Sequence, residues 1–440
     1  MKIYFVSLGC DKNSVDSEVM SGILVRNGHE FTEDPSDADA AVINTCCFIG
    51  DAKEESINNI ISIGRYKTEG KLRALIVAGC LGQRYKDKIH ELLPEVDAIV
   101  GIASIDKINE ALMSVVDDKA CDFIDETVRT PISDTGRVIS TGGYTEYLKI
   151  AEGCNKKCTY CVIPSVRGAY RSIPMEKLYA EAQSLVQRGV KELILVAQET
   201  TLYGVDLYKE KSICKLINKL SEIEELRWIR VLYCYPEEIT DELIDVIKNN
   251  PKVVHYLDLP IQSGSDRILK LMGRRTNKKE ITELVAKLRT AVPDICLRTT
   301  LITGFPEETD KDHEESVKFV EELKFDRLGV FTYSREENTP AGEMKKQIPQ
   351  RIKNRRRDDI MKRQQSISLS SSQKMIGRTL DVLVEGYIPD EGVYAGRSYK
   401  DAPDVDGYVF ISSDKELMSG DFVSVKITDC SEYDLIGELI

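Results

Sequence analysis

The sequence has no apolar run that approaches the ~20 residues of a membrane-spanning helix. Its first residues, MKIYFVSLGC, also lack the charged and then apolar layout of a signal peptide. We therefore expect a cytoplasmic protein without a membrane partner. Positive charge is not in excess either, because 60 Lys and Arg oppose 73 Asp and Glu, for a net charge of −13. That balance argues against a surface that coats nucleic-acid phosphates along its whole length.

Histidine is scarce, whereas cysteine is not. The chain has four histidines and twelve cysteines. In a long intracellular chain, cysteines are more often metal ligands or catalytic groups than partners in disulfides. Sulfur is therefore the better place to look for chemistry.

The length of 440 residues predicts roughly three domains at about 150 residues each. Strands are predicted at 2–8, 40–44, 73–78 and 98–100, with helices between them from residue 14 to 27, 51 to 68 and 83 to 93. Strands separated by helices indicate an open parallel α/β sheet covered on both faces. We expect this N-terminal domain to span residues 1–116, followed by a polar linker at 114–143.

A longer alternation of strands and helices follows. Strands are predicted at 147–150, 192–196, 228–233, 255–259, 295–302 and 328–333, with helices that include 175–188, 240–248, 278–290 and 312–323. Six such units make a partial (βα)6 barrel, short of the eight that close a full one. This central domain is expected to span residues 140–370.

The last part of the chain has a different residue pattern, with a basic run followed by short β-rich segments. A basic run at 343–364 is interpreted as a solvated helix face, with a nucleic-acid or ribosome contact as the minority interpretation. Short β-rich pieces at 380–385, 407–411 and 422–428 then predict a small all-β barrel over residues 373–440. This module carries fourteen acidic and six basic residues, a net −8.

Three cysteines stand close together in EGCNKKCTYC, namely Cys154, Cys158 and Cys161. Three thiolates at this spacing hold three corners of one [4Fe–4S] cube and leave the fourth iron open for a substrate or cofactor. Tetrahedral zinc is the rival ligand, but a structural zinc site wants four protein ligands and no fourth Cys or His lies nearby. A purely structural role has a low prior for thiols clustered in a loop.

A second set of cysteines is defined by position. Cys10, Cys46 and Cys80 each follow a predicted strand, in FVSLGC, AVINTC and LIVAGC. Because the carboxyl ends of parallel strands share one edge of a sheet, these thiols are expected to converge into a second three-thiolate cluster site. The alternative is three unrelated buried cysteines. Cys47 adjoins Cys46, and because neighbouring side chains of an extended segment point in opposite directions, only Cys46 is assigned as the ligand.

Weaker signals lie elsewhere. The segments VAQETTLYG (196–204), LPIQSGSD (259–266) and TTLITGFPEET (299–309) fall where barrel loops would face a ligand, and together they outline a site for adenosine and methionine moieties, although each alone is ordinary turn chemistry. The other five cysteines have no ligand spacing and are interpreted as packing residues: Cys121, Cys214, Cys234, Cys296 and Cys430.

The loop EGCNKKCTYC resembles the cluster loop of radical S-adenosylmethionine enzymes, whose Cys-x3-Cys-x2-Cys pattern Cys154, Cys158 and Cys161 fulfil. The preceding domain is similar to the N-terminal domain of methylthiotransferases, and the tail to their TRAM domain. SLGCDKNSVDSE, AQETTLYG, RTTLITGFPEET and GRSYKDAPDVDG resemble the branch that modifies an aspartate of small-subunit ribosomal protein twelve. The family usually has Gly where this chain has Cys47.

The resemblance implies a function and its cofactors. The expected reaction adds a methylthio group to the β-carbon of an aspartate of ribosomal protein twelve, with two [4Fe–4S] clusters and S-adenosylmethionine as cofactors. The cluster at Cys154, Cys158 and Cys161 would bind S-adenosylmethionine for radical generation, and that at Cys10, Cys46 and Cys80 would carry the sulfur. Expected partners are the ribosomal protein, an electron donor and a sulfur donor, with nucleic acid not primary.

Three other functions remain open from the residues alone. A tRNA adenosine methylthiotransferase would use the same clusters on another substrate, although a −8 tail favours a basic protein over tRNA phosphates. A non-catalytic iron–sulfur electron-transfer or carrier protein would need neither the barrel nor open irons. A zinc-stabilised RNA-binding module would contain zinc without iron or sulfide.

Overall fold

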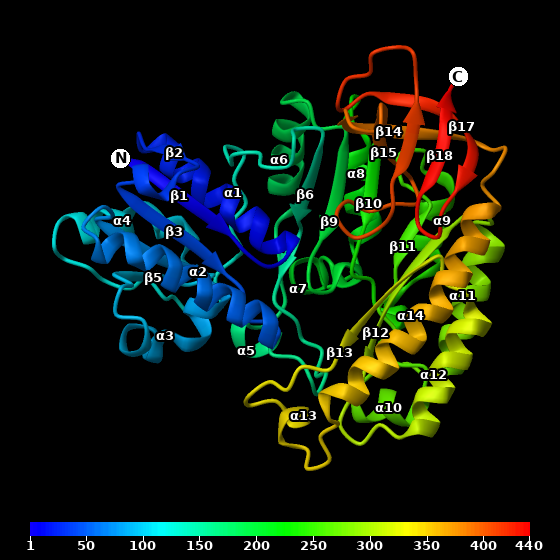
Figure 1. Cartoon of the computed structure of the whole chain (residues 1–440), viewed down its shortest axis with the longest axis horizontal. Helices are drawn as coiled ribbons and strands as arrows, with labels where there is room; N and C mark the ends of the chain where they lie inside the picture. The colour runs from blue at the N-terminus through cyan, green and yellow to red at the C-terminus, as the bar shows by residue number, and fades with distance from the viewer.

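A computed structural model describes residues 1–440, which fold as an N-terminal sheet domain, a central half-open barrel and a small C-terminal barrel (Figure 1). The N-terminal sheet is parallel throughout, with strand order β2-β1-β3-β4-β5. Its elements are β1 (Lys2–Ser7), α1 (Asp11–Arg26), β2 (Glu30–Thr32), η1 (Pro35–Asp37), β3 (Ala40–Thr45), α2 (Gly50–Thr68), β4 (Ala74–Gly79), α3 (Cys80–Leu92), β5 (Ala98–Val100), η2 (Ile105–Lys107) and α4 (Ile108–Val116).

Both faces of this sheet are buried, as the alternation of strands and helices predicts. Ile43 and Val77 face the layer of α2 and α3, whereas Val42 and Ile76 face the layer of α1 and α4. Consecutive strand residues therefore pack in two separate cores, which explains why every residue of β3 and β4 is buried. Helix α1 begins at Asp11, three residues before the predicted Ser14, because Cys10 occupies the cap position.

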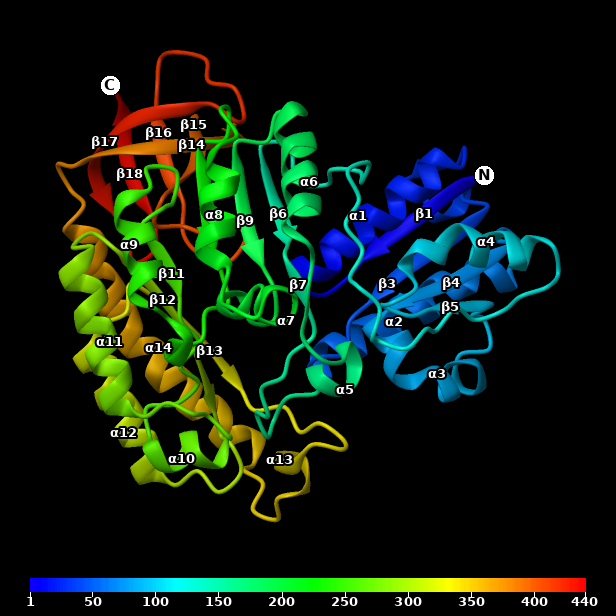
Figure 2. The ribbon, with the colours of Figure 1, turned by 180° about the vertical axis from the view of Figure 1, so that it is seen from behind.

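The central domain contains the six predicted parallel strands, arranged as two three-stranded sheets of order β10-β9-β6 and β11-β12-β13 (Figure 2). A core of 45 buried residues lies between these strands and the helices that cover them. The strands are β6 (Thr145–Lys149), β9 (Glu192–Val196), β10 (Trp228–Val231), β11 (Tyr256–Asp258), β12 (Cys296–Thr303) and β13 (Arg327–Thr332), and the long helices are α6 (Met175–Gln187), α8 (Ile213–Ser221), α9 (Asp241–Asn249), α11 (Lys278–Ala291), α12 (Asp310–Leu323) and α14 (Gln350–Gln373). Short elements connect them: β7 (Ala151–Glu152), α5 (Ile163–Arg167), β8 (Arg171–Ser172), η3 (Thr200–Leu202), α7 (Val205–Tyr208), η4 (Pro236–Glu238), α10 (Asp266–Leu271) and α13 (Pro340–Glu343).

The polar segment at 114–143 connects α4 to β6, and it is anchored to both domains. Arg137 is completely buried, and its guanidinium lies 3.2 Å from Glu146 and 3.5 Å from both Glu18 and Glu181. The interpretation of the basic run on α14 as a solvated face needs correction. Arg356 is only 3% exposed and pairs with Glu308 at 3.1 Å, so part of this charge holds the helix against the barrel.

The C-terminal residues form a closed barrel of order β14-β15-β16-β18-β17. Its strands are β14 (Thr379–Ile388), β15 (Val393–Ser398), β16 (Val409–Ser412), β17 (Phe422–Cys430) and β18 (Leu435–Leu439), of which β15 and β18 were not predicted. Val382, Val409 and Val425 form part of its core. No helix of the structure is both long enough and apolar enough to cross a membrane.

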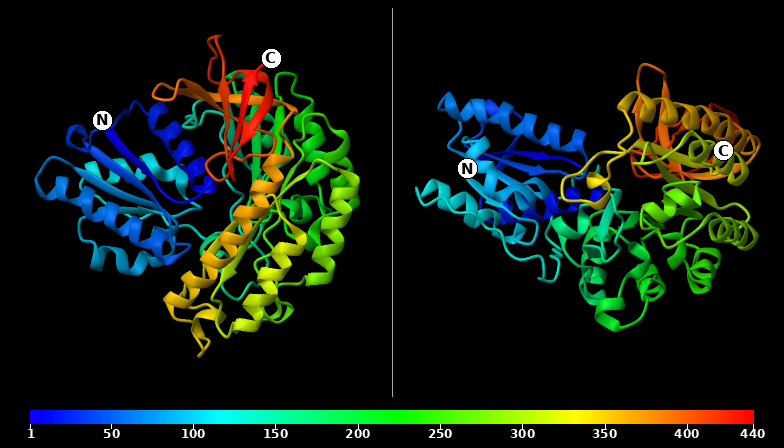
Figure 3. Two further views of the ribbon diagram at one scale, coloured as in Figure 1. Left: turned by 45° about the vertical axis from the view of Figure 1, so that its right-hand side comes forward. Right: turned by 90° about the horizontal axis from the view of Figure 1, so that it is seen from below.

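A loop of this small barrel reaches between the two sheets of the central domain. Ala402 packs in one cluster with Ile194, Tyr256 and Cys296, and Tyr256 donates its hydroxyl to Asp406 at 2.6 Å. The chain from β15 to β16 thus packs near the strand beginnings, on the side away from the carboxyl ends. Figure 3 shows the small barrel against the central domain.

Buried ion pairs hold this loop in place. Arg397 is 2.8 Å from Glu192, which Arg230 also contacts at 2.8 Å. Burial alone would raise the pKa of the Glu192 carboxyl, but Arg397 and Arg230 together lower that pKa below its usual value. Glu192 is therefore ionised and fully paired inside the protein.

Replacing Arg397 by Met leaves Glu192 with half of its charge compensation, so we expect the variant to lose about 3–5 kcal/mol of stability. Denaturant unfolding is followed by the fluorescence of Trp228, the only tryptophan, whose ring lies 4.7 Å from Phe422 of the small barrel. Lys415→Met, in an exposed turn, serves as the control. Equal unfolding midpoints for the two variants would contradict this account.

Candidate metal centres

The strands that precede Cys10, Cys46 and Cys80 lie side by side in the sheet. Strand β3 pairs with β1 on one side and β4 on the other, in parallel. Cys46 directly follows β3, Cys80 directly follows β4, and Cys10 lies three residues beyond the end of β1. The sheet topology therefore brings the three predicted thiols to the same edge, in adjacent positions.

Contacts around Asn13 tie the three loops together. The Asn13 amide nitrogen donates to the carbonyl oxygens of Leu8 at 2.9 Å and Thr45 at 3.0 Å, and its oxygen accepts from the Cys80 sulfur at 3.8 Å. Gly9 has a φ of +99°, and a Cβ there would lie 2.7 Å from the Cys46 Cβ. Only glycine permits this approach of the Cys10 loop to Cys46.

Cys46 and Cys47 point in different directions. The Cys47 side chain is 1% exposed, contacts the carbonyl oxygen of Cys80 at 3.3 Å and packs in the core beneath α2 and α3. Burial raises the pKa of its thiol to about 11. Cys46 instead lies beside Gly9 and the Cys10 loop. This geometry supports Cys46 as the third member of the group.

The donor set at this edge consists of soft sulfur with cationic support. Cys10 caps α1 and Cys80 begins α3, so both stand where the helix dipoles favour negative charge. Burial raises the pKa of the Cys80 thiol, an effect that the neighbouring Arg167 opposes. The Cys80 thiol therefore stays protonated when free and loses its proton to a bound metal. These residues fit an iron–sulfur group better than a hard cation.

The second trio lies in the loop between β7 and α5. Cys154 and Cys158 are buried, and Cys161 is partly exposed. The backbone N–H groups of Lys156 and Ile163 donate to the sulfurs of Cys154 and Cys161, each at 3.4 Å. Amide donors of this kind stabilise anionic sulfur, so this loop also fits a thiolate-held cluster.

Neighbouring elements anchor this loop at the carboxyl ends of the barrel strands. Thr159 bonds through its amide to the carbonyl of Met272 at 2.9 Å and through its hydroxyl to that of Leu271 at 2.8 Å. Tyr235, just beyond β10, places its hydroxyl 3.7 Å from the Cys158 sulfur. The Arg274 guanidinium stacks 4.1 Å from the centre of the Tyr235 ring. The predicted segments at 196–204, 259–266 and 299–309 also lie at these strand ends.

No three His, Cys, Asp or Glu side chains are placed to hold a single metal ion. A four-iron cube distributes its ligands over separate irons, so its thiols stand farther apart than the ligands of one ion. Among the remaining cysteines, Cys214, Cys234 and Cys296 lie in cores, as the packing interpretation predicts. Cys430 packs at the edge of the small barrel's core. Cys121 is exposed, so the packing interpretation is wrong for it.

A buried group of charged residues between the two trios was not predicted. Lys149 pairs with Asp16 and, at 3.1 Å, with Glu152, whereas Arg167 lies 2.8 Å from Glu152 and 3.5 Å from Asp16. Asp16 belongs to the N-terminal domain, and the other three to the barrel domain. The signal in the sequence is the polar run DKNSVDSE, because α1 buries most of these polar side chains instead of exposing them.

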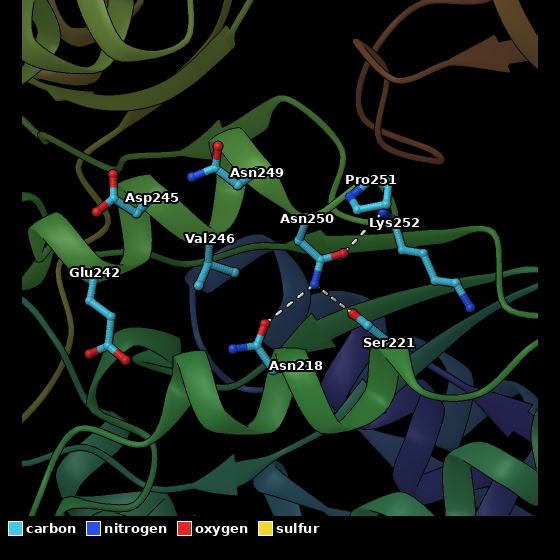
Figure 4. Close-up of a pocket in the computed structure, with 9 residues that line it drawn as sticks. All are labelled: Asn218, Ser221, Glu242, Asp245, Val246, Asn249, Asn250, Pro251 and Lys252. Atoms are coloured by element: carbon cyan, nitrogen blue, oxygen red, sulfur yellow. Dashed lines mark hydrogen bonds between the residues drawn. The ribbon is translucent and has the colours of Figure 1, made fainter.

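Two cavities of the structure differ in their position relative to the thiol trios. One cavity of about 740 Å³ lies between α8 and α9 and is lined almost entirely by polar side chains such as Asn218 and Asn250 (Figure 4). Neither thiol trio borders it. A second cavity of about 390 Å³ lies where the start of α2 meets the end of β13, and there the Gly50 amide donates to the Ser334 hydroxyl at 3.0 Å. Gly50, which lines this cavity, is four residues beyond Cys46 in the sequence.

Three family models match the chain in succession. The model described as "Uncharacterized protein family UPF0004" matches residues 2–101, the "Radical SAM superfamily" model matches 148–320, and the "TRAM domain" model matches 376–440.

Curated relatives match over full length. The ribosomal protein uS12 methylthiotransferase RimO of Lachnoclostridium phytofermentans is 55% identical over 437 residues, which are 99% of each chain. The RimO of Acetivibrio thermocellus is 49% identical over 446 residues, 100% of this chain and 98% of the relative. That of Clostridium botulinum strain Eklund 17B is 47% identical over 441 residues, 99% and 97% of the two chains.

Solved structures share the fold at low identity. The radical S-adenosylmethionine methyltransferase TsrM from Kitasatospora setae, with cobalamin and a [4Fe-4S] cluster bound, matches with a TM-score of 0.57 at 14% identity, over 78% of this chain and 74% of its own. The cobalamin-dependent S-adenosylmethionine radical enzyme OxsB, with aqua-cobalamin and S-adenosylmethionine bound, matches with a TM-score of 0.51 at 14% identity. The match covers 82% of this chain and 56% of the OxsB chain. Both likenesses support the predicted fold.

The opposed directions of Cys46 and Cys47 give a direct test. In a chain whose Cys154, Cys158 and Cys161 are replaced by Ala, we expect Cys47→Ala to retain about four irons after anaerobic reconstitution and Cys46→Ala to retain almost none. Iron and sulfide analysis measures both. The reverse ranking would make Cys47 the ligand.

Proposed function

The chain belongs to the RimO family of ribosomal protein uS12 methylthiotransferases, and on that premise we propose that it adds a methylthio group to the β-carbon of an aspartate in uS12. Its cofactors are [4Fe–4S] clusters and S-adenosylmethionine. The observation that carries the proposal is the arrangement of two separate thiol trios across one domain interface. Arg167 joins them, because it contacts the Cys80 sulfur at 3.2 Å and Glu152, two residues before Cys154, at 2.8 Å.

We assign one cluster to each trio. Cys154, Cys158 and Cys161 hold the cluster that binds S-adenosylmethionine, and Cys10, Cys46 and Cys80 hold the other. When bound, these groups supply one-electron cleavage of S-adenosylmethionine at the first site and sulfur for transfer at the second. An electron donor and a sulfur donor are therefore required partners. We place the N-terminal domain at 1–116, the radical core at 140–370 and the TRAM domain at 373–440.

The residues around the trios have defined tasks in this proposal. The amides of Lys156 and Ile163 stabilise the thiolates of the first site through their bonds to Cys154 and Cys161. The strand-end segments at 196–204, 259–266 and 299–309 line the space for S-adenosylmethionine. Contacts between α1 and the barrel domain, such as the bond from the Tyr233 hydroxyl to Asp11 at 3.1 Å, help to exclude water from a reactive carbon centre.

The charge of the small barrel favours a protein substrate over tRNA. Two of its six basic residues, Arg397 and Lys400, are buried in pairs with Glu192 and Asp326. Its acidic turns remain exposed, for example at Asp390 and Glu416. A basic ribosomal protein is attracted by such a surface, whereas tRNA phosphates are repelled. We place this reaction in the cytoplasm, where ribosomal proteins are made, and treat a nucleic-acid contact as secondary.

Two cysteine substitutions separate the roles of the two sites. We expect Cys158→Ala to abolish reductive cleavage of S-adenosylmethionine. Cys80→Ala should leave that cleavage intact and stop methylthio formation, because only the sulfur-carrying site is lost. Product analysis by chromatography and mass spectrometry of a uS12 peptide measures both reactions. Methylthio product from the Cys80→Ala protein would overturn the role assignment.

The acidic turns make binding sensitive to salt. Four exposed acids of the small barrel are neutralised together: Asp390→Asn, Glu391→Gln, Asp414→Asn and Glu416→Gln. We expect weaker binding of uS12 at low salt and no difference at high salt, since exposed charges are screened.

The matched control removes four exposed acids from the N-terminal domain: Glu54→Gln, Glu55→Gln, Asp87→Asn and Glu91→Gln. Binding is measured by titration of labelled uS12 with each variant. Equal affinities for the two variants at low salt would show that the small barrel does not attract the substrate. Modified tRNA nucleosides in place of modified uS12 would identify the tRNA-modifying alternative.

A further inference from the structure

One side chain of the barrel domain reaches a sulfur of the N-terminal trio. Arg167 is the last residue of α5, six residues beyond Cys161, and it is 1% exposed. Its guanidinium donates to the Cys80 sulfur at 3.2 Å, to Glu152 at 2.8 Å and also to the Asn13 side chain. A single planar group thus bonds to both domains.

The charges around this guanidinium are balanced without the thiol. Arg167 and Lys149 are the two cations of the buried group, and Asp16 and Glu152 are its two anions. A contact to Cys80 is therefore not needed to neutralise Arg167. Its N–H groups nevertheless point to the sulfur, where they are useful only when that sulfur carries negative charge.

We propose that Arg167 is a positioning residue for the sulfur-carrying centre, which it orients through Cys80 and whose reduction potential it raises. The inference rests on the proposed function, in particular on Cys80 as a cluster ligand. Hydrogen bonds and positive charge at a ligand sulfur stabilise the more negative, reduced state of a cluster. Because the same side chain is bonded to Glu152, the centre is fastened to the loop that carries Cys154.

The fork geometry of arginine is required for this task. Five N–H donors in one rigid plane serve a sulfur, an amide oxygen and a carboxylate together, whereas the three donors of lysine radiate from one point. A lysine at position 167 therefore keeps the charge but loses part of the bonding. We expect its effect to be smaller than that of a neutral residue and to have the same direction.

A purely structural role is the alternative, in which Arg167 only pairs with Glu152 and Asp16. The two roles predict different effects of a substitution at Arg167 on the Fe–S(Cys) bonds and the reduction potential of the sulfur-carrying centre. Loss of an ion pair that touches no sulfur changes stability but leaves the Fe–S(Cys) bonds of the centre unchanged. Loss of a donor to the Cys80 sulfur changes those bonds and the potential of the centre.

The experiment uses the full chain with Cys154, Cys158 and Cys161 replaced by Ala, reconstituted anaerobically so that only the other trio can hold iron. Arg167→Lys, Glu152→Gln and the double variant Arg167→Met with Glu152→Gln are compared in this background. The double variant removes one positive and one negative charge, so the charges of the buried group stay balanced. We therefore expect the double variant to fold. Arg171→Met is the control, because Arg171 lies in the same segment and donates only to carbonyl oxygens.

Two readouts are taken on each variant: the Fe–S(Cys) stretching bands in resonance Raman spectra and the midpoint potential in an EPR-monitored titration. We expect the double variant to shift the stretching bands and to move the potential to a more negative value than Glu152→Gln does. Arg167→Lys should shift both less, and Arg171→Met should shift neither. The proposal would be overturned if the stretching bands of Arg167→Lys equalled those of the background chain and the bands of the double variant equalled those of Glu152→Gln. This comparison holds even where a potential is too low to measure.

Failure of the inference is distinct from failure of the proposed function. If the background chain with native Arg167 binds no iron, the assignment of Cys10, Cys46 and Cys80 is wrong. If it binds about four irons and the spectra do not respond to position 167, only the role of Arg167 is wrong.

Discussion

The structure depends on a buried seam of charge between its first two domains. Asp16 of α1 contacts Lys149 and Arg167 of the barrel domain, and Glu152 completes the group. Charges buried in this way are costly unless each is paired, so the seam tolerates one relative arrangement of the domains and penalises others. That arrangement sets the Cys80 loop against the loop that leads to Cys154. The placement of one thiol trio relative to the other is thus fixed by ion pairs, and not by either domain alone.

The same device operates at the other end of the barrel. Arg397 and Arg230 neutralise Glu192, and Asp406 lies 3.6 Å from Arg298 of β12. Arg298 in turn contacts Asp258 at 2.9 Å, and Asp258 accepts from the backbone amide of Tyr233. Tyr233 donates its hydroxyl to Asp11, the neighbour of Cys10. A chain of polar contacts therefore runs from the small barrel through the central barrel to the N-terminal thiols.

Much of this arrangement was readable in the sequence, for identifiable reasons. Strand β9 is a fully buried, mostly apolar segment, and β12 alternates buried and half-buried positions along most of its length. The repetition of such strands with helices between them predicted the parallel sheets. Convergence of the Cys10, Cys46 and Cys80 loops followed from one rule about the edges of parallel sheets. Strands β2, β15 and β18 were missed, because β2 is an exposed edge strand with one apolar residue, Phe31, and the other two acquire their registers only when the small barrel closes. Arg167 and Asp16 were also missed, since partners separated by 151 positions leave no local pattern.

The account requires that both trios hold clusters at the same time. Iron and acid-labile sulfide counted on the native, anaerobically reconstituted chain test this most directly, with Mössbauer spectra to identify the cluster type. We expect about eight irons and about eight sulfides per chain, all in [4Fe–4S] form. About four of each, after reconstitution has reached its limit, would contradict the scheme of two centres.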